Sequence, residues 1–259
     1  MIATSTPTPA ASSRRYASLA AGLGLLGMAV LAPIAHFGVL ETLVQPNDAT
    51  ATVSNILAAE GSFRLAVAAL LVVSFLDMLV AWAVYILLRP VNRPLALLAA
   101  WLRLAAAAAF LPALANLLDV AQLLGGTATA TVPAVQLEAQ VMASLASFHN
   151  GWDIILAVFG LHLVGVGVLV FRSVAFPRFL GVLVAVAGLG YLADTFARIL
   201  VPDFDFTFSH LTFVGEPLLI GWFLWRAIKG FTDEPGDPRQ LAVRAGAAVG
   251  LPVVARPAG

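Results

Sequence analysis

Long apolar runs separated by short polar segments divide most of the chain into six parts. The runs occupy residues 17–40, 63–88, 94–124, 149–171, 179–200 and 208–227. Each run is close to or longer than the roughly 20 residues that an α-helix needs to cross the hydrocarbon core of a bilayer. The pattern therefore predicts an all-α protein, a polytopic membrane bundle of six transmembrane helices.

The start of the first run has two interpretations. Arg14 and Arg15 precede an apolar core, which is the layout of a signal peptide as well as of a membrane span. The length of the run and the lack of a clear small-residue cleavage site after it favour a transmembrane helix. We accordingly predict a disordered N-terminal segment at 1–13, a transmembrane domain at 14–230 and a flexible cytoplasmic tail at 231–259.

Lys and Arg residues gather at alternate ends of the apolar runs. One side of the predicted bundle carries Arg14, Arg15, Arg89, Arg93, Arg172, Arg178, Arg226 and Lys229. The connecting segments on the other side are poor in basic residues. Because basic loops stay in the cytoplasm, this asymmetry predicts that both termini are cytoplasmic.

Two connecting segments on the opposite, outer side carry apolar residues at intervals. Residues 47–60 place Val53, Ile56 and Leu57 among polar residues, and residues 135–148 have a similar pattern. Each segment is either a short helix on the outer membrane surface, which at 135–148 runs straight into the fourth span, or a solvated connector. The pattern supports the two interpretations about equally.

The composition agrees with a lipid environment. The 259 residues are 61% hydrophobic and 11% charged, whereas a soluble domain carries roughly 25% charged residues. The 14 basic and 14 acidic residues balance, which argues against a nucleic acid as partner. The chain has no cysteine, and this excludes disulfides, thiolate metal sites and cysteine nucleophiles.

Four ionisable residues fall within the apolar runs at similar depth. Counting about 1.5 Å per helical residue from the inner Arg residues puts Asp77 roughly 18 Å deep. The same count puts Arg103, His162 and Glu216 roughly 15 Å deep. Ionisable groups inside a bilayer are costly, so they are candidates for function. Asp77 and Arg103 lie on consecutive runs, and we expect a structural ion pair between them.

Glu216 and His162 then remain as candidates for binding a ligand or a proton. Glu216 has no basic partner once the ion pair forms, so burial favours its neutral form. Pro217 follows it, and a proline frees the carbonyl four residues earlier, that of Phe213, from its helical hydrogen bond. Both candidates also have a simpler interpretation, in which each only forms a hydrogen bond to a neighbouring helix.

A second polar layer lies in the outer third of the predicted spans. Its imidazole and carboxylate groups include His149, Asp153, Asp194 and His210. These four residues either form a metal site or belong to a polar rim that water and lipid headgroups reach. We favour the rim and assign no metal. Arg198 follows Asp194 by four residues, so we expect a local ion pair between them.

Several motifs resemble a known family of bacterial membrane proteins. They are PNDATATVSNILAAEGSFR at 46–64, LLRPVNRPLA at 87–96, FGLHL at 159–163, PRFLG at 177–181 and GLGYLAD at 188–194. In this order they resemble the family named domain of unknown function 4386, from about Tyr16 to Gly230. The resemblance implies a multi-pass protein of the bacterial cytoplasmic (inner) membrane, and it implies no activity or cofactor.

We predict an integral membrane protein that binds or passes a small ligand, a proton or a cation. The predicted site is an outward-facing intramembrane pocket that descends from the outer polar rim toward Glu216 and His162. One alternative is a membrane-embedded, metal-dependent enzyme that acts on a lipid-like substrate through the outer residues. A second alternative is a structural or assembly protein without a pocket. The chain has no GxSxG motif and no phosphate-binding loop, and the leading prediction is non-catalytic.

Overall fold

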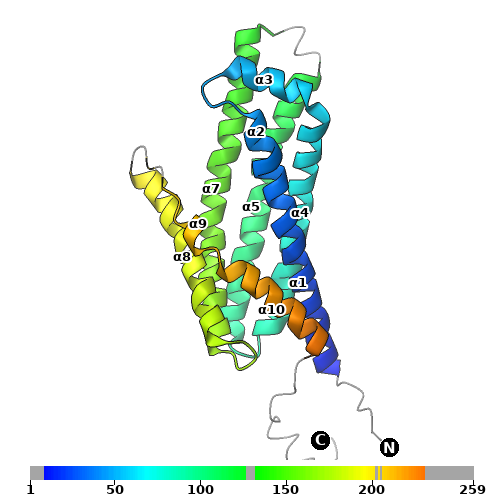
Figure 1. The fold of residues 1–259 in the computed structure, drawn as a ribbon, viewed down its shortest axis with the longest axis vertical. Helices are drawn as coiled ribbons and strands as arrows, with labels where there is room; N and C mark the ends of the chain where they lie inside the picture. The colour runs from blue at the N-terminus through cyan, green and yellow to red at the C-terminus, as the bar shows by residue number, and fades with distance from the viewer. Residues whose placement is uncertain (1–8, 127–131, 202–203, 205, 231–259) are drawn as a thin grey trace, which may run out of the picture.

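The computed structural model describes residues 9–126, 132–201, 204 and 206–230, and within them it contains helices and no strand. The helices of the first half are α1 (Pro9–Ala35), the π-helical turn η1 (His36–Leu40), α2 (Glu41–Leu43), α3 (Ala49–Ala58), α4 (Glu60–Leu88) and α5 (Arg93–Gly125). Those of the second half are α7 (Ala134–Arg172), α8 (Arg178–Leu200), α9 (Ser209–Thr212) and α10 (Gly215–Lys229) (Figure 1).

Six segments of the described chain are long and apolar enough to cross a membrane. They are Ser13–Leu43, Glu60–Leu88, Arg93–Gly125, Ala134–Arg172, Arg178–Leu200 and Ser209–Lys229. These segments confirm the predicted all-α bundle of six spans. The predicted tail at 231–259 and the first eight residues of the predicted N-terminal segment lie outside the described residues. The direction in which the bundle crosses the membrane stays a prediction.

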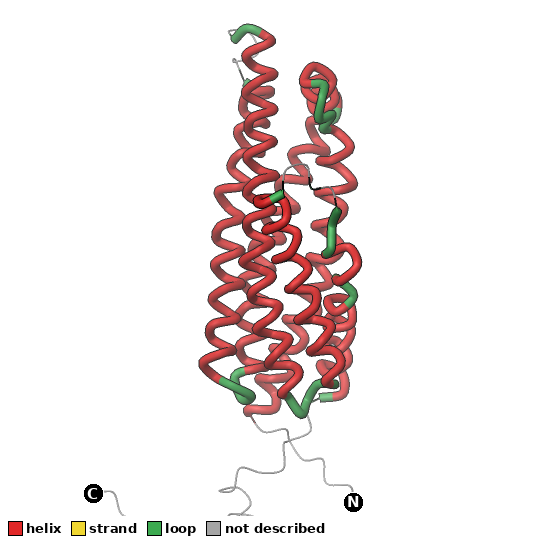
Figure 2. The backbone as a smooth tube through the Cα atoms, turned by 90° about the vertical axis from the view of Figure 1, so that its left-hand side faces the viewer, coloured by secondary structure: helices red, strands yellow, loops and turns green. Residues whose placement is uncertain are grey.

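The long helices form a closed ring in which each one packs against two neighbours. The order around the ring is α1, α4, α5, α7, α8 and α10, and α10 closes it by contacting both α8 and α1. Helices α4, α5 and α7 run along the long axis of the molecule, whereas α10 crosses its lower half obliquely (Figures 1 and 2). We call the end with the α4–α5 and α7–α8 turns the inner end, after the predicted topology. The opposite end is the outer end.

Local sequence signals account for the helix boundaries. Asn92 caps α5 by accepting a 3.0 Å hydrogen bond from the Leu95 amide, and Pro94 occupies the first turn. Asp48 caps α3 in the same way, with 2.8 Å to the Ala51 amide. These caps satisfy amides that would otherwise have no partner at a helix start.

Both outer connectors are helical, and each buries one face. Residues 49–58 form α3, which buries Thr52 and Ile56. Residues 135–148 extend α7 upward from its membrane span and bury a stripe that includes Val141 and Leu145. Their apolar residues pack into a core at the outer end of the ring.

Two apolar clusters fill the ring, one near each end. The inner cluster includes Val84, Ala99 and Val166, and the outer cluster includes Leu70 and Phe110. On α4, α5 and α7 the residues between the two clusters include the buried polar side chains Asp77, Arg103 and His162. The centre of the bundle is therefore polar although both of its ends are apolar.

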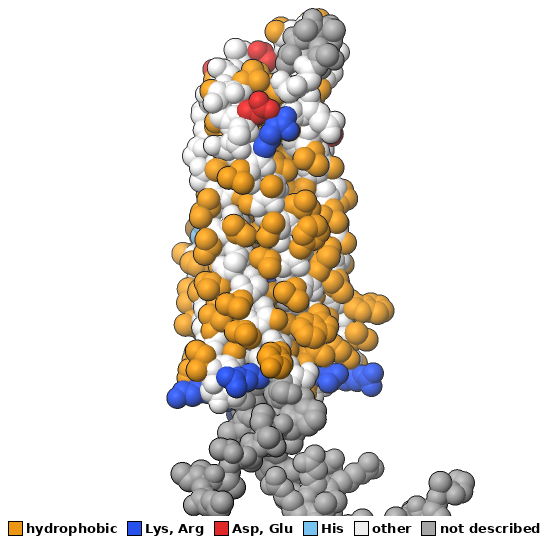
Figure 3. Space-filling view, turned by 90° about the vertical axis from the view of Figure 1, so that its right-hand side faces the viewer, with side chains coloured by type: hydrophobic (Ala, Val, Ile, Leu, Met, Phe, Trp, Pro, Cys, Tyr) orange, Lys and Arg blue, Asp and Glu red, His pale blue; other side chains and the backbone are white. Residues whose placement is uncertain are grey.

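The outer surface of the bundle is apolar along most of its length. Figure 3 shows one face on which apolar side chains cover the region between a basic band at the inner end and charged residues near the outer end. Such a band is what a bilayer requires of a protein surface, with Lys and Arg residues at the headgroup level. The surface thus agrees with six membrane spans.

Candidate functional site

The ring contains a buried ion pair at its centre. Arg103 Nη2 on α5 lies 2.5 Å from Asp77 Oδ1 on α4, and the two side chains are 2% and 12% exposed. Asp77 and Arg103, for which the sequence predicts similar depths, are therefore in direct contact. Arg103 Nη2 also lies 3.7 Å from the Met28 sulfur on α1. The Nε of Arg103 is buried and has no hydrogen-bond partner among the described residues.

His162 on α7 connects this pair to the backbone of α5. Its Nε2 lies 3.1 Å from Arg103 Nη1, and its Nδ1 lies 2.7 Å from the Ala99 carbonyl oxygen. A guanidinium only donates hydrogen bonds and a carbonyl only accepts them. His162 is consequently a neutral imidazole with its proton on Nδ1. Both of its ring nitrogens are engaged, so it supports Arg103 and has no nitrogen left for a ligand.

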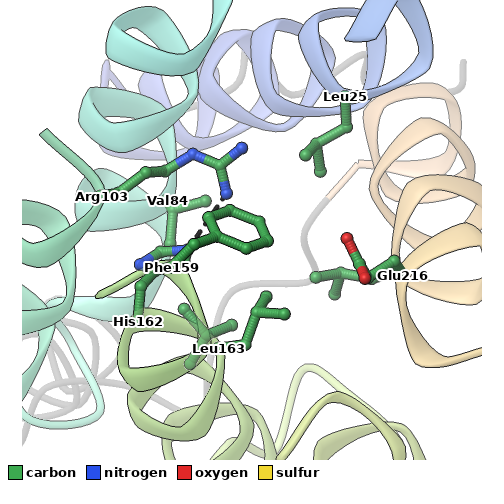
Figure 4. Close-up of a pocket in the computed structure, with 9 residues that line it drawn as sticks. Leu25, Val84, Arg103, Phe159, His162, Leu163 and Glu216 are labelled. Carbon is green, nitrogen blue, oxygen red and sulfur yellow. Dashed lines mark hydrogen bonds between the residues drawn. The ribbon is translucent and has the colours of Figure 1, made fainter. Parts of the chain in front are cut away.

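Glu216 approaches the same region from the first turn of α10. Its Oε1 accepts a 2.8 Å hydrogen bond from the Tyr191 hydroxyl on α8. The side chain is half-buried, and its carboxylate points toward Phe159 and Arg103 across a small space (Figure 4). The expected free carbonyl of Phe213 is not present, because it accepts a 2.9 Å hydrogen bond from the Glu216 amide.

A small cavity separates the Arg103 group from the Glu216 group. Its volume is about 20 Å³, which is enough for about one water molecule. Its lining comes from five helices and consists of Leu25, Val84, Arg103, Phe159, His162, Leu163, Val166, Glu216 and Leu219. The Phe159 ring lies between the charged groups, with its centroid 5.1 Å from Arg103 Cζ and 5.9 Å from the Tyr191 ring. His162 and Glu216 thus face one cavity, as the shared depth suggested.

The outer residues follow a different arrangement from the predicted one. Asp194 Oδ1 and Oδ2 accept hydrogen bonds from the Phe208 and Ser209 amides, at 2.5 and 2.9 Å. Arg198 pairs with Asp153 on α7. The predicted Asp194–Arg198 pair is therefore wrong, because the amides at the start of α9 occupy both oxygens of Asp194. The Asp194 carboxylate therefore stabilises the connection between α8 and α9.

The four outer candidates do not converge. His210 is exposed on α9, and His149 lies beside His36, with 5.8 Å between the ring centroids. No group of three or more His, Asp or Glu residues in the described part of the chain has the geometry of a metal site. Among the residues that line the described cavity there is none of these four. None of the four therefore belongs to the lining of the midplane cavity.

Sequence reasoning missed two aromatic members of the midplane region, Phe159 and Tyr191. Tyr191 lies 13 residues after Arg178, and at about 1.5 Å per residue this gives a depth of roughly 20 Å. Counting tyrosine with the ionisable residues would have placed it near Glu216. The sequence does not predict the position of Phe159, because an apolar residue in an apolar helix does not indicate which residues it will contact.

The fold and this buried polar centre define a multi-pass α-helical membrane protein. The chain belongs to the family described as Domain of unknown function (DUF4386), which it matches over residues 20–227. It is also 31% identical over 155 residues to an uncharacterized protein of Archaeoglobus fulgidus. That match covers 60% of this chain and 77% of the relative. No solved structure matches the chain significantly. The family resemblance seen in the sequence motifs is confirmed.

Proposed function

We propose that this protein binds a proton at Glu216, in the midplane cavity of the helix ring, as part of binding or passing a small ligand or proton through the membrane. The observation that carries the proposal is the placement of the Glu216 carboxylate. It reaches into the cavity from α10 and accepts one hydrogen bond within the described chain, from Tyr191. A carboxyl in this position can gain and lose a proton without breaking an ion pair of its own.

The charges of the region favour this exchange. Asp77 and Arg103 compensate each other through their 2.5 Å contact. An ionised Glu216 adds one uncompensated negative charge near the bilayer midplane, which is costly. One proton on Glu216 removes that charge. The Glu216 side chain therefore serves as a proton-binding group that exchanges between its neutral and its ionised form.

The cavity supplies room for the proton to move. A space of about 20 Å³ accommodates about one water molecule, and Arg103 and Glu216 border it as polar partners. A water molecule bound in this space would connect the acid to the guanidinium without a direct salt bridge between them.

Infrared spectroscopy of the purified full-length protein in lipid nanodiscs tests the proposal. A protonated carboxylic acid in an apolar setting has a carbonyl band that an ionised one lacks. We expect such a band to disappear as the pH rises, and Glu216→Gln to remove its contribution from the difference between spectra recorded at low and high pH. Tyr191→Phe is expected to move the frequency of the band, because the hydroxyl no longer donates to Oε1.

Glu138→Gln is the matched control, because Glu138 lies at the outer end of α7, outside the cavity lining. A titrating band that survives Glu216→Gln unchanged would refute the proton site. In that event the structural or assembly role becomes the better account. The alternative of a metal-dependent enzyme gains no support from the described His, Asp and Glu residues, which form no metal-binding group.

A further inference from the structure

The lining of the midplane cavity has a buried back and a half-exposed front. Arg103, His162 and Val166 belong to the back and are buried. Leu25, Phe159 and Glu216 are half-buried and come from α1, α7 and α10. Figure 4 shows these three side chains around the open part of the cavity. The cavity is thus closed toward α4 and α5 and accessible from the side of α1 and α10.

This accessible side faces the bilayer. α10 lies between α1 and α8, and within the described residues no extensive contact joins α1 to α8 (Figure 1). On α7, residues 151–159 run behind this side and all remain half-buried or exposed. Glu216 shares the cavity with Arg103 and His162, which lie roughly 15 Å from the inner Arg residues by helical rise along α5 and α7, near the midplane of a hydrocarbon core about 30 Å thick. A molecule that reaches the front of the cavity there comes from the lipid phase.

We propose, resting on the proton site assigned to Glu216, that the cavity binds the ammonium group of a single-chain primary alkylamine that enters sideways from the bilayer. In this arrangement the ammonium replaces the proton as the charge that neutralises the Glu216 carboxylate. The alkyl chain extends past the start of α10 to the lipid-facing side, where no extensive contact joins α1 to α8. Proton and amine therefore compete for one carboxylate.

Charge and aromatic contact favour an ammonium group. Asp77, Arg103 and an ionised Glu216 together leave one negative charge in excess, so the site attracts a cation and repels an anion. The Phe159 ring borders the same space and offers its face to a cation, as it does to Arg103 at 5.1 Å. A primary ammonium also carries three donors, which suit a carboxylate and a water molecule.

Size decides which ammonium fits. A cavity of about 20 Å³ takes about one water-sized group, and a primary ammonium has that size. A quaternary ammonium carries three further carbon atoms around its nitrogen and is too large. A phospholipid headgroup is larger again and resides at the membrane surface, far from Glu216. The chemistry of the site therefore selects a long-chain primary amine.

Competition in nanodiscs tests this inference. The full-length protein is titrated with dodecylamine, and both the loss of the protonated carboxyl band and the rise in unfolding temperature are recorded. We expect dodecylamine to remove the band, and dodecyltrimethylammonium and dodecanoate to leave it. Glu216→Gln should weaken dodecylamine binding by about tenfold to a hundredfold, as for the loss of a charged hydrogen bond.

A second variant tests the route without touching the carboxylate. Leu25→Trp fills the front of the cavity, and Leu23→Trp places the same ring on an exposed part of α1. We expect Leu25→Trp to keep the titrating band and to lose the effect of dodecylamine, and Leu23→Trp to keep both. Equal effects of the primary and quaternary amines, or unchanged amine binding in Leu25→Trp, would overturn the inference. A titrating Glu216 band that ignores dodecylamine overturns this inference alone, whereas the absence of any such band overturns the proton site first.

Discussion

His162 and Arg103 form a buried hydrogen bond between α7 and α5, with 3.1 Å from Nε2 to Nη1. The second ring nitrogen of His162 contacts the Ala99 carbonyl at 2.7 Å. Because one partner only donates and the other only accepts, the imidazole has a single possible protonation pattern. A residue of a type that often titrates near neutral pH is here held as a fixed structural link.

The first prediction concerns this link. In nitrogen NMR spectra of the labelled protein, His162 should show the neutral tautomer with the proton on Nδ1. His162→Phe should lower the free energy of unfolding by about 1–3 kcal/mol, because it leaves a buried donor of the Arg103 guanidinium without a partner. His210→Phe is the control, since His210 is exposed and its replacement should change stability by less than about 0.5 kcal/mol. An imidazolium signal from His162 would contradict the assignment.

The second prediction is that the Asp77–Arg103 pair is strongly coupled. Asp77→Asn and Arg103→Met should each destabilise the protein by about 3–5 kcal/mol, because each leaves a buried charge without its partner. The double variant should be less damaged than the sum of the two. Thermal unfolding in detergent measures all three.

The exposed pair Glu60–Arg64 provides a matched control for this cycle. Its atoms are 2.8 Å apart, but its side chains are about half exposed. Solvent and salt screen such a pair, so Glu60→Gln with Arg64→Met should show a coupling of no more than about 1 kcal/mol. Similar coupling energies in the buried and exposed pairs would show that the Asp77–Arg103 ion pair makes no special contribution to stability.

The third prediction concerns the close packing of α7 against α8. A Cβ added at Gly167 would lie 2.6 Å from the Gly181 carbonyl oxygen, so the two backbones must separate to admit it. Gly167→Ala should therefore destabilise the protein by about 1–3 kcal/mol. At Gly221 on α10 the same methyl meets no atom within 4 Å. Gly221→Ala should be neutral or stabilising by up to about 1 kcal/mol, and a loss equal to that of Gly167→Ala would argue against the contact.

The fourth prediction concerns the carboxylate that holds the start of α9. Asp194→Ala should release the Phe208 and Ser209 amides, whose hydrogen bonds to Asp194 it removes. Hydrogen–deuterium exchange should then speed up at these two amides more than elsewhere on α9. Asp153→Asn is the control, because Asp153 pairs with Arg198 and does not contact either amide. Equal protection in Asp194→Ala and the parent protein would show that other contacts hold α9.

The fifth prediction tests the orientation in the membrane. The native chain has no cysteine, so single cysteines report without background. In intact cells an impermeant thiol reagent should label Ser54→Cys on α3 and Gln136→Cys on α7, which are both exposed. It should not label Val174→Cys, which is 83% exposed in the α7–α8 turn at the inner end. The reverse pattern would invert the topology.

The number of spans and the shared level of Arg103 and His162 were readable from the chain. A run of apolar residues must match the thickness of a bilayer, so its length identifies a span. A helix rises by a constant amount per residue, and counting from the inner Arg residues put Arg103 and His162 at one depth. The structure joins these two side chains directly.

The partners of the polar side chains were decided by the tertiary structure. Depth is a single coordinate along a helix, whereas contact also requires the neighbours around the ring and the direction of each face. These spans are apolar on nearly all sides, so their sequences carry little information on which face turns inward. Arg198 was thus expected at Asp194 and instead pairs with Asp153, because the packing of α8 turns Asp194 toward the amides of α9. The same packing brings Tyr191 to Glu216, a contact between two helices that only their arrangement in space determines.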